Sequence, residues 1–352
     1  MLKTTARICK KCFKEFEVLV QFQNKTDICL DCQGLLDDEK NKPMEIVIKP
    51  EILDLSNIKQ GEGSQEFRPS NWNEYIGQDE AKEKAQKFVE GCKKFNEPYP
   101  HTFISAPAGM GKSLFATILA NQLKKKIIFT TGGELKNEQT FIDKLTECDG
   151  GVIFIDEANR LNKKVGFFIL PLIEQFMIHG QNLKRFTCIF ATTHIGDISK
   201  DLDALISRCE CINLKPYTHI ELLKIITQYN KKQYPSIIIS KNILNEIVIN
   251  CRQTPRLAKN LVRSYAYIQD WKKIKKFNNI VYEGLTHQDI KVLKYLLEYK
   301  GSGKNSIANY LRVKPQTYEW EIEPYLVYRE LITVSNKRKI TSKGQNLLTN
   351  IS

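Results

Sequence analysis

The chain has 352 residues, of which 42% are hydrophobic and 26% charged, so it is long enough for two or three domains and is not a disordered chain. No apolar stretch approaches the roughly 18 residues that a membrane span needs, and the first residues lack the apolar segment of a secretory signal, so we expect a cytoplasmic protein without a membrane partner. The net charge of +13 favours a polyanionic partner such as DNA, although an excess of lysine can also serve solubility alone.

The first 40 residues predict a zinc ribbon. Two C-x-x-C pairs, sixteen residues apart, provide four thiolates for Zn²⁺: Cys9, Cys12, Cys29 and Cys32. The intervening residues 13–28 favour a short hairpin, too small to fold without the metal, and the module would recruit DNA or a protein. The alternative is a thioredoxin-like redox pair, but it needs a βαβ unit that so short a segment cannot supply. The other six cysteines lack ligand spacing and are expected to be buried.

Residues 41–66 are polar and charged and are predicted to be a linker. Strands and helices then alternate over 67–215, which predicts a parallel sheet flanked by helices. The expected strands cover 101–105, 126–131, 152–156, 186–192 and 209–213.

The segment FISAPAGMGKS predicts a phosphate-binding loop. A buried strand, a tight loop over 106–111 and a helix over 113–123 make backbone N–H groups converge on an anion. Lys112 then reaches the β- and γ-phosphates of ATP. Ala106 stands where the usual pattern has its first glycine, so the loop requires a negative φ at this residue.

A second motif, GVIFIDEANRL, places two carboxylates at the end of an apolar strand. We expect Asp156 to hold Mg²⁺ together with Ser113, while Glu157 activates the attacking water. The two motifs are predicted to lie on adjacent strands. They predict an enzyme that hydrolyses ATP, and the alternative is a chance turn beside an ordinary strand.

The chain becomes helical over 216–283, where Thr254 and Pro255 open a helix predicted to run to Trp271. Residues 284–352 form a separate unit with eleven Lys or Arg against six Asp or Glu. Its expected helices cover 289–299, 306–311 and 318–328, and its two strands lie within 331–341.

Several segments resemble RuvB, the AAA+ motor of Holliday-junction branch migration. They are FRPSNWNEYIGQ, APAGMGKS, IDEANRL, ATTH, QTPRLAKNLVR and IEPYLVYRELI, in the order and spacing of that family, and they cover about Phe67 to Leu348. The resemblance implies an α/β fold: an AAA+ P-loop ATPase domain over 67–215, a helical lid over 216–283 and a C-terminal winged-helix domain over 284–352. It also implies a ring of subunits, expected to be a hexamer.

The resemblance assigns roles to single residues. Nucleotide binding is implied for Phe67, Arg68, Tyr75, Ile76, Ala108, Gly109, Met110, Gly111, Lys112, Ser113, Leu114, Tyr217 and Arg256. Thr193, at the tip of the strand between the two nucleotide-binding strands, is the implied sensor of the γ-phosphate, and Arg256 reports the nucleotide to the lid. Arg208 is the implied finger that enters the neighbouring subunit and stabilises transition-state charge. A surface arginine at a helix end is the alternative.

The basic tip of the winged helix is the predicted DNA contact. Lys337, Arg338 and Lys339 would bind phosphates without reading the sequence, whereas a solvated basic turn is the alternative. Val334 stands where the family has its first wing arginine, which implies an altered contact. Residues 301–304, GSGK, lack a preceding apolar strand and are not interpreted as a second phosphate loop.

Three features depart from the family. In RuvB a long β-hairpin docks onto the partner RuvA, and here only MIHGQNLKRF occupies its place, so this element looks deleted. The segment Ser207 to Cys209 resembles clamp-loader ATPases, and Ile206 replaces an arginine of RuvB. The cysteine module is absent from RuvB.

Three hypotheses follow from these features. The first is an ATP-driven motor on branched or duplex DNA in recombination, repair or replication. The second is a clamp-loader-like or helicase-loader AAA+ ATPase that remodels a partner protein on DNA. The third, a DNA-binding regulator with a silent ATPase, is disfavoured by the intact Lys112, Asp156, Glu157 and Arg208.

Overall fold

The computed structural model describes residues 4–8, 15–19, 66–178, 180–193 and 203–351, and the chain divides into two compact units, Met1–Gly63 and Ser64–Ser352. In the first unit, β1 (Thr4–Ile8) pairs antiparallel with β2 (Glu15–Leu19). β2 thus pairs with residues that precede Cys9, and most of the hairpin predicted within 13–28 lies outside the described residues. The predicted zinc ligands Cys9, Cys12, Cys29 and Cys32 lie outside the described residues.

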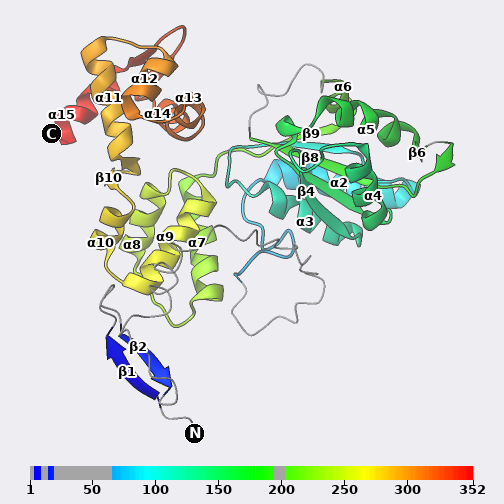
Figure 1. Cartoon of the computed structure of the whole chain (residues 1–352), viewed down its shortest axis with the longest axis horizontal. Coiled ribbons are helices and arrows are strands. Elements are labelled where there is room, and N and C mark those ends of the chain that lie inside the picture. The colour runs from blue at the N-terminus through cyan, green and yellow to red at the C-terminus, as the bar shows by residue number, and fades with distance from the viewer. Residues whose placement is uncertain (1–3, 9–14, 20–65, 179, 194–202, 352) are drawn as a thin grey trace, which may run out of the picture. The chain divides into compact units, whose positions relative to one another are not determined.

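A five-stranded parallel sheet forms the centre of the ATPase domain (Figure 1). Its strands, in spatial order, are β4 (Ile127–Thr131), β5 (Val152–Asp156), β8 (Thr187–Thr192), β3 (Thr102–Ser105) and β9 (Glu210–Asn213). Because β8 lies between β3 and β5, the prediction that the two nucleotide-binding motifs lie on adjacent strands is wrong. The position of Thr193 beyond a strand between them agrees with the RuvB resemblance.

Helices cover both faces of this sheet. Successive strand residues point to opposite faces, so Ile104 and Phe154 lie in one core and Phe103 and Ile153 in the other. The first core includes α2 (Asp79–Phe95) and α3 (Lys112–Leu123), and the second includes α4 (Glu138–Cys148) and α5 (Lys163–Gln175). The sheet is thus buried on both sides, and its carboxyl edge is left for the site.

Buried His101 fixes the end of α5 to the sheet. Its Nδ1 accepts a hydrogen bond from the Cys188 backbone N–H at 2.9 Å, so the proton is on Nε2, which donates to the Ile173 carbonyl at 3.1 Å. Burial lowers the pKa of His101 to about 4, which keeps the imidazole neutral. This contact orients the last turn of α5, where Glu174 lies.

A short hairpin follows α5. It consists of β6 (Met177–Ile178) and β7 (Gln181–Asn182), which pair antiparallel over two residues each. The stretch that occupies the place of the long hairpin therefore forms only a short hairpin, with two paired residues in each strand.

The lid is a cluster of helices that shares the first core of the ATPase domain: α7 (His219–Gln233), α8 (Lys241–Asn250), α9 (Pro255–Ile268) and α10 (Trp271–Phe277). The predicted helix from Pro255 to Trp271 is wrong at its end. Gln269 has a left-handed backbone with φ 53°, and the Asp270 side chain accepts a hydrogen bond from the Lys273 N–H. This cap starts a new helix at Trp271.

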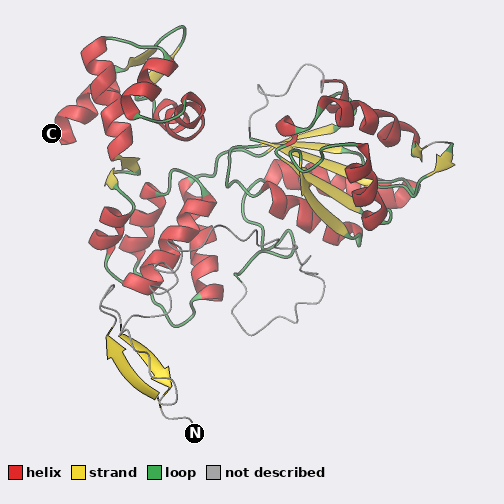
Figure 2. Cartoon of the chain, in the orientation of Figure 1, coloured by secondary structure: helices red, strands yellow, loops and turns green. Residues whose placement is uncertain are grey.

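The C-terminal domain mixes helices with a two-stranded wing (Figure 2). A turn of β10 (Ile280–Tyr282) and β11 (Leu285–Thr286) leads into it. The domain contains α11 (His287–Tyr299), α12 (Lys304–Leu311), α13 (Pro315–Thr317), a π-helical segment (Tyr318–Ile322), α14 (Glu323–Tyr328), β12 (Ile332–Val334), β13 (Arg338–Ile340) and α15 (Ser342–Ile351). Across the residues described, no helix combines the length and apolarity that crossing a membrane would take.

Candidate active site at the phosphate loop

The phosphate loop joins β3 to α3, and its glycines have backbones that other residues rarely adopt. Gly109 and Gly111 have φ of 80° and 93°. Ala106 is not among the described residues with positive φ, so it meets the condition that its sequence position imposes. Ser113 lies exposed on the first turn of α3, where free helix N–H groups can bind an anion.

Lys112 is the first residue of α3, and its side chain extends back into this loop. It is only 7% exposed, and its Nζ donates hydrogen bonds to the carbonyls of Ala106 at 2.8 Å and Pro107 at 3.3 Å. Burial lowers its pKa, nearby Asp156 opposes that effect, and Arg256 adds to it. The three charged side chains therefore act on one another at the loop, and a bound triphosphate would offset the two positive charges.

The second motif presents its carboxylates from the end of β5. The Asp156 side chain accepts a hydrogen bond from the Glu157 N–H at 2.9 Å, which fixes one carboxylate oxygen and leaves its other lone pairs available to a cation or water. Glu157 has φ 48° and begins a turn, Ala158–Arg160, and its carboxylate pairs with Arg160 at 3.1 Å. Among the described residues, no group of three or more His, Cys, Asp or Glu side chains is arranged to hold a metal ion.

Two neighbours of this motif were missed by sequence reasoning. Gly132, after β4, donates its N–H to the Asp156 carbonyl at 2.8 Å, and a Cβ there would lie 2.5 Å from the Glu157 carbonyl. Thr192, at the end of β8, donates to the Asn159 side chain at 3.3 Å. Thr193 follows it, half-buried, beyond the carboxyl end of the same strand.

The lid touches the phosphate loop where α9 begins. A Cβ on Gly109 would lie 2.6 Å from the Thr254 methyl and 2.9 Å from the Arg256 Cβ. Only glycine fits this approach. The structure thus places Arg256 at the loop.

Two buried tyrosines lie on the other side of the loop. The hydroxyls of Tyr75 and Tyr217 are 3.4 Å apart, and Tyr217 donates to the Met110 carbonyl at 3.4 Å. The Tyr75 hydroxyl would lie 3.2 Å from a Cβ on Gly111. Burial raises the pKa of both tyrosines, so both stay protonated and polar.

The remaining nucleotide-binding candidates differ in exposure. The Phe67 N–H donates to Gln233 of α7 at 2.5 Å, which ties this segment to the lid. Arg68 and Ala108 are exposed, Ile76 and Leu114 are half-buried, and Met110 is buried. Trp72 was missed by sequence reasoning, and its ring lies edge-on to Tyr75 and to Phe115.

Arg208 lies just after the short helix α6 (Asp203–Ile206), on the protein surface. Its side chain is 38% exposed, forms an ion pair with Glu174 and donates to the Ala204 carbonyl at 2.7 Å. Arg208 is thus held in place by contacts with α5 and α6 of the same subunit.

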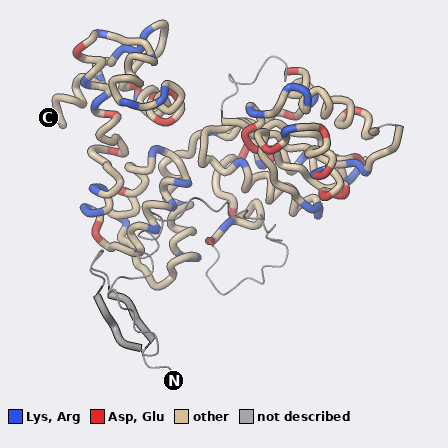
Figure 3. The backbone as a smooth tube through the Cα atoms, in the orientation of Figure 1, with Lys and Arg blue, Asp and Glu red and all other residues tan. Residues whose placement is uncertain are grey.

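The three predicted DNA-binding residues of the wing differ in their exposure. Lys337 and Lys339 are exposed, whereas the Arg338 guanidinium forms a two-pronged ion pair with Glu323, at 2.6 and 3.1 Å, with both side chains nearly buried. The prediction that Arg338 is free for a phosphate therefore disagrees with the structure. Lys304 of the GSGK segment likewise pairs with Glu319, at 2.9 Å. Figure 3 marks the Lys and Arg positions of this domain in blue.

The fold and this site define the class of the protein: an AAA+ ATPase domain joined to a winged-helix domain. Residues 67–209 match the Holliday junction DNA helicase RuvB P-loop domain, and residues 282–349 match the RuvB C-terminal winged helix domain. The chain belongs to the RuvB family.

The matches to individual relatives extend over most of each relative's length. The Holliday junction branch migration complex subunit RuvB of a Nitratiruptor species is 31% identical over 287 residues, which are 74% of this chain and 84% of that protein. The same subunit of Sulfurimonas denitrificans is 31% identical over 312 residues, 80% of this chain and 90% of that protein. The solved Thermotoga maritima RuvB branch migration motor has a TM-score of 0.73 at 31% identity and covers 81% of this chain and 99% of that one.

Proposed function

We propose that this protein is an ATP-driven DNA motor that moves Holliday junctions and related branched or duplex DNA in recombination and repair. The observation that carries the proposal is a complete ATPase loop joined to a basic winged helix within a RuvB-family chain. The relatives named above are subunits of a Holliday junction branch migration complex.

The residues at the loop have separate roles in ATP hydrolysis. Backbone N–H groups of residues 108–114 and the Lys112 ammonium bind the phosphates. Ser113 and Asp156 hold Mg²⁺, which neutralises charge on the β- and γ-phosphates. Glu157 orients the attacking water and accepts its proton.

The surrounding residues recognise and report the nucleotide. Tyr75 and Tyr217 lie against the loop, where they contact the adenosine together with Phe67, Arg68 and Ile76. Thr193 senses the γ-phosphate from the end of β8. Arg256 does so from the lid, whose first turn of α9 packs on Gly109.

A ring, which we propose to be a hexamer, completes each site. Arg208 is exposed and held by Glu174 of its own subunit, and in the ring it reaches the γ-phosphate of the neighbour. A planar guanidinium supplied in this way stabilises transition-state charge and makes hydrolysis depend on assembly.

Partner binding is the feature in which this chain departs from the family pattern. The hairpin β6–β7 has only two residues in each strand, which favours recruitment by another route or a loader-type ATPase. The deciding experiment is migration of a synthetic four-way DNA junction by the purified protein. ATP-dependent migration by the protein alone supports the motor. ATP hydrolysis stimulated only by a partner protein, without migration, supports the loader.

The DNA contact of the wing can be tested by substitution. A variant with Lys337→Ala and Lys339→Ala should bind duplex DNA more weakly at every sequence, and the slope of log affinity against log salt should fall by about two. Fluorescence anisotropy over a salt series measures this slope. The matched control is Lys343→Ala, because Lys343 is an exposed lysine of the same domain that pairs with Glu330 at 2.9 Å. An unchanged slope in the double variant would remove the wing from the interface.

We further propose that the N-terminal cysteines bind one Zn²⁺ as a recruiting module. The support is their spacing and the pairing of β1 with β2, which flank the segment that contains the first pair of cysteines. Metal analysis of protein purified without chelators should find about one zinc per chain, and Cys29→Ser should lose it. Cys211→Ser is the control, since Cys211 is a free, exposed cysteine. Zinc-free wild-type protein would refute this proposal.

A further inference from the structure

The loop between α8 and α9 combines two unusual backbones with contacts at both ends. Arg252 and Gln253 have φ of 52° and 54°, a left-handed conformation that non-glycine residues adopt only when their surroundings impose it. Thr254 and Arg256 follow directly. The loop therefore has little freedom, and its conformation depends on what each end touches.

One end of this loop touches the nucleotide site. The Thr254 methyl and the Arg256 Cβ lie so close to Gly109 that no side chain fits between them. A bound phosphate that shifts the loop at Gly109 must also shift the start of α9. Arg256 adds an electrostatic link, since its charge lowers the pKa of Lys112.

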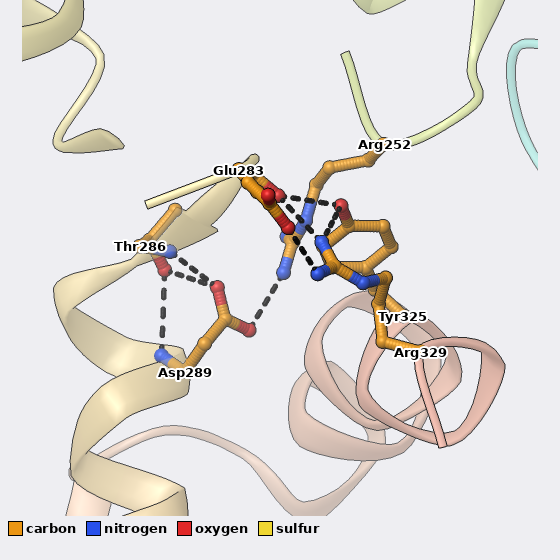
Figure 4. Close-up of polar contacts among 6 residues, drawn as sticks. All are labelled: Arg252, Glu283, Thr286, Asp289, Tyr325 and Arg329. Atoms are coloured by element: carbon orange, nitrogen blue, oxygen red, sulfur yellow. Dashed lines mark hydrogen bonds and ion pairs between the residues drawn. The ribbon is translucent and has the colours of Figure 1, made fainter. Parts of the chain in front are cut away.

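The other end reaches into the winged-helix domain. The Arg252 guanidinium donates to Asp289 Oδ1 at 2.6 Å and lies 4.5 Å over the ring of Tyr325 (Figure 4). Asp289 is completely buried, and its second oxygen accepts from the N–H and hydroxyl of Thr286, at 2.6 and 2.7 Å. This carboxylate therefore caps α11 and binds the lid at the same time. The neighbouring Gln253 donates to the Tyr328 hydroxyl.

The connection between the two domains is packed around this ion pair. Gly284, in the β10–β11 turn, donates its N–H to Asn250 at 2.9 Å, and a Cβ there would lie 2.9 Å from the Tyr325 hydroxyl. Arg329 pairs with Glu283 at 2.5 Å and also donates to its carbonyl at 2.9 Å (Figure 4). With the connection fixed in this way, a displacement of Arg252 acts on α11 through Asp289.

We infer that the Arg252–Asp289 ion pair transmits the nucleotide state of the phosphate loop to the winged-helix domain, so that ATP sets the affinity of that domain for DNA. Arg252 is then a positioning residue, since it acts through Asp289. The inference rests on the proposed DNA-motor function. It adds a route by which the nucleotide acts on the winged helix. The route runs from the phosphate loop through residues 254–256 to Arg252, and from there through Asp289 to α11.

The first test is a thermodynamic cycle on a double variant, Arg252→Met with Asp289→Asn. Methionine keeps packing against Tyr325, and asparagine keeps an oxygen for Thr286, so the pair is removed without leaving one buried charge unpaired. Affinity for a labelled four-way junction is measured with a slowly hydrolysed ATP analogue and with ADP. In wild type the two affinities should differ about fivefold or more, and in the double variant the ratio should fall toward one. Hydrolysis without DNA should stay within about twofold of wild type.

The matched control removes an ion pair that lies within the winged helix. Lys304→Met with Glu319→Gln should keep the wild-type affinity ratio, since this pair does not cross to the lid. A folded Arg252→Met, Asp289→Asn variant that retains the wild-type ratio would overturn the inference. A wild-type protein that binds the junction equally well with the ATP analogue and with ADP would also overturn the inference. Failure of the motor function itself is detected separately, as absence of junction migration or of hydrolysis by wild type.

A second measurement needs no variant and no DNA. Hydrogen exchange of the wild-type protein is compared in the ATP analogue and in ADP. The backbone amides of the first turn of α11, residues 287–290, should exchange at different rates in the two nucleotides, while those of the wing strands β12 and β13 should not. Identical exchange in the α11 turn would refute transmission through Asp289, whatever the double variant does.

Discussion

An Arg208→Ala variant should hydrolyse ATP about 10³-fold more slowly than wild type while binding ATP with nearly unchanged affinity. The expected loss is in turnover because a finger arginine acts on charge that develops only in the transition state. In its own subunit Arg208 lies on the surface, paired with Glu174, rather than against Lys112. Steady-state hydrolysis and equilibrium binding of a fluorescent ATP analogue measure the two quantities.

Mixing experiments separate a finger supplied by a neighbour from one that acts within its own subunit. Lys112→Ala destroys the phosphate loop but keeps Arg208, and Arg208→Ala does the reverse. Mixed rings then contain some sites with both residues, so the mixture should recover activity that neither variant shows alone. A mixture as inactive as its components would place Arg208 outside the neighbour's site.

Glu174→Gln is the matched control for this prediction. It removes the partner of Arg208 but leaves the arginine intact, and both side chains are about two-fifths exposed. Exposed ion pairs of this kind contribute at most about 1 kcal/mol, so the change in turnover should be small. Loss of turnover comparable to Arg208→Ala would show that the pairing with Glu174 itself is required.

Local patterns predicted the elements of the nucleotide site but not how they are arranged. The strand that ends at Ser105, the loop and the strand that ends at Asp156 were each predicted from apolar runs and glycines. Their order in the sheet was not, because the crossovers that insert β8 between β3 and β5 depend on packing far along the chain. Only the family resemblance implied that order.

Arg338 shows a different limit. Its neighbours Lys337 and Lys339 made all three residues look like one basic tip. Successive residues of a strand face opposite sides, so in β13 Arg338 points away from the side of Lys339, and there it meets Glu323. The alternation was readable in the sequence, but its buried partner was not. The pairing of Arg252 with Asp289 could not be predicted either, because the two residues are distant in the sequence.

Glu157→Gln should reduce hydrolysis by about 10²- to 10⁴-fold without weakening ATP binding. The amide keeps the size of the side chain at the turn that starts with φ 48°, but it cannot accept a proton from the attacking water. ATP-bound subunits should therefore accumulate and stay assembled on DNA. Single-turnover hydrolysis and retention of labelled ATP on the protein measure the two effects.

The ion pair of Glu157 with Arg160 supplies the control for this last prediction. Arg160→Gln removes the pair, which is largely exposed, but leaves the carboxylate that does the chemistry. Its effect on turnover should be within about fivefold, because an exposed ion pair is worth at most about 1 kcal/mol. If Glu157→Gln kept more than a tenth of wild-type turnover, Asp156 or another group would have to serve as the base, since a water-activating carboxylate cannot be neutralised at so low a cost.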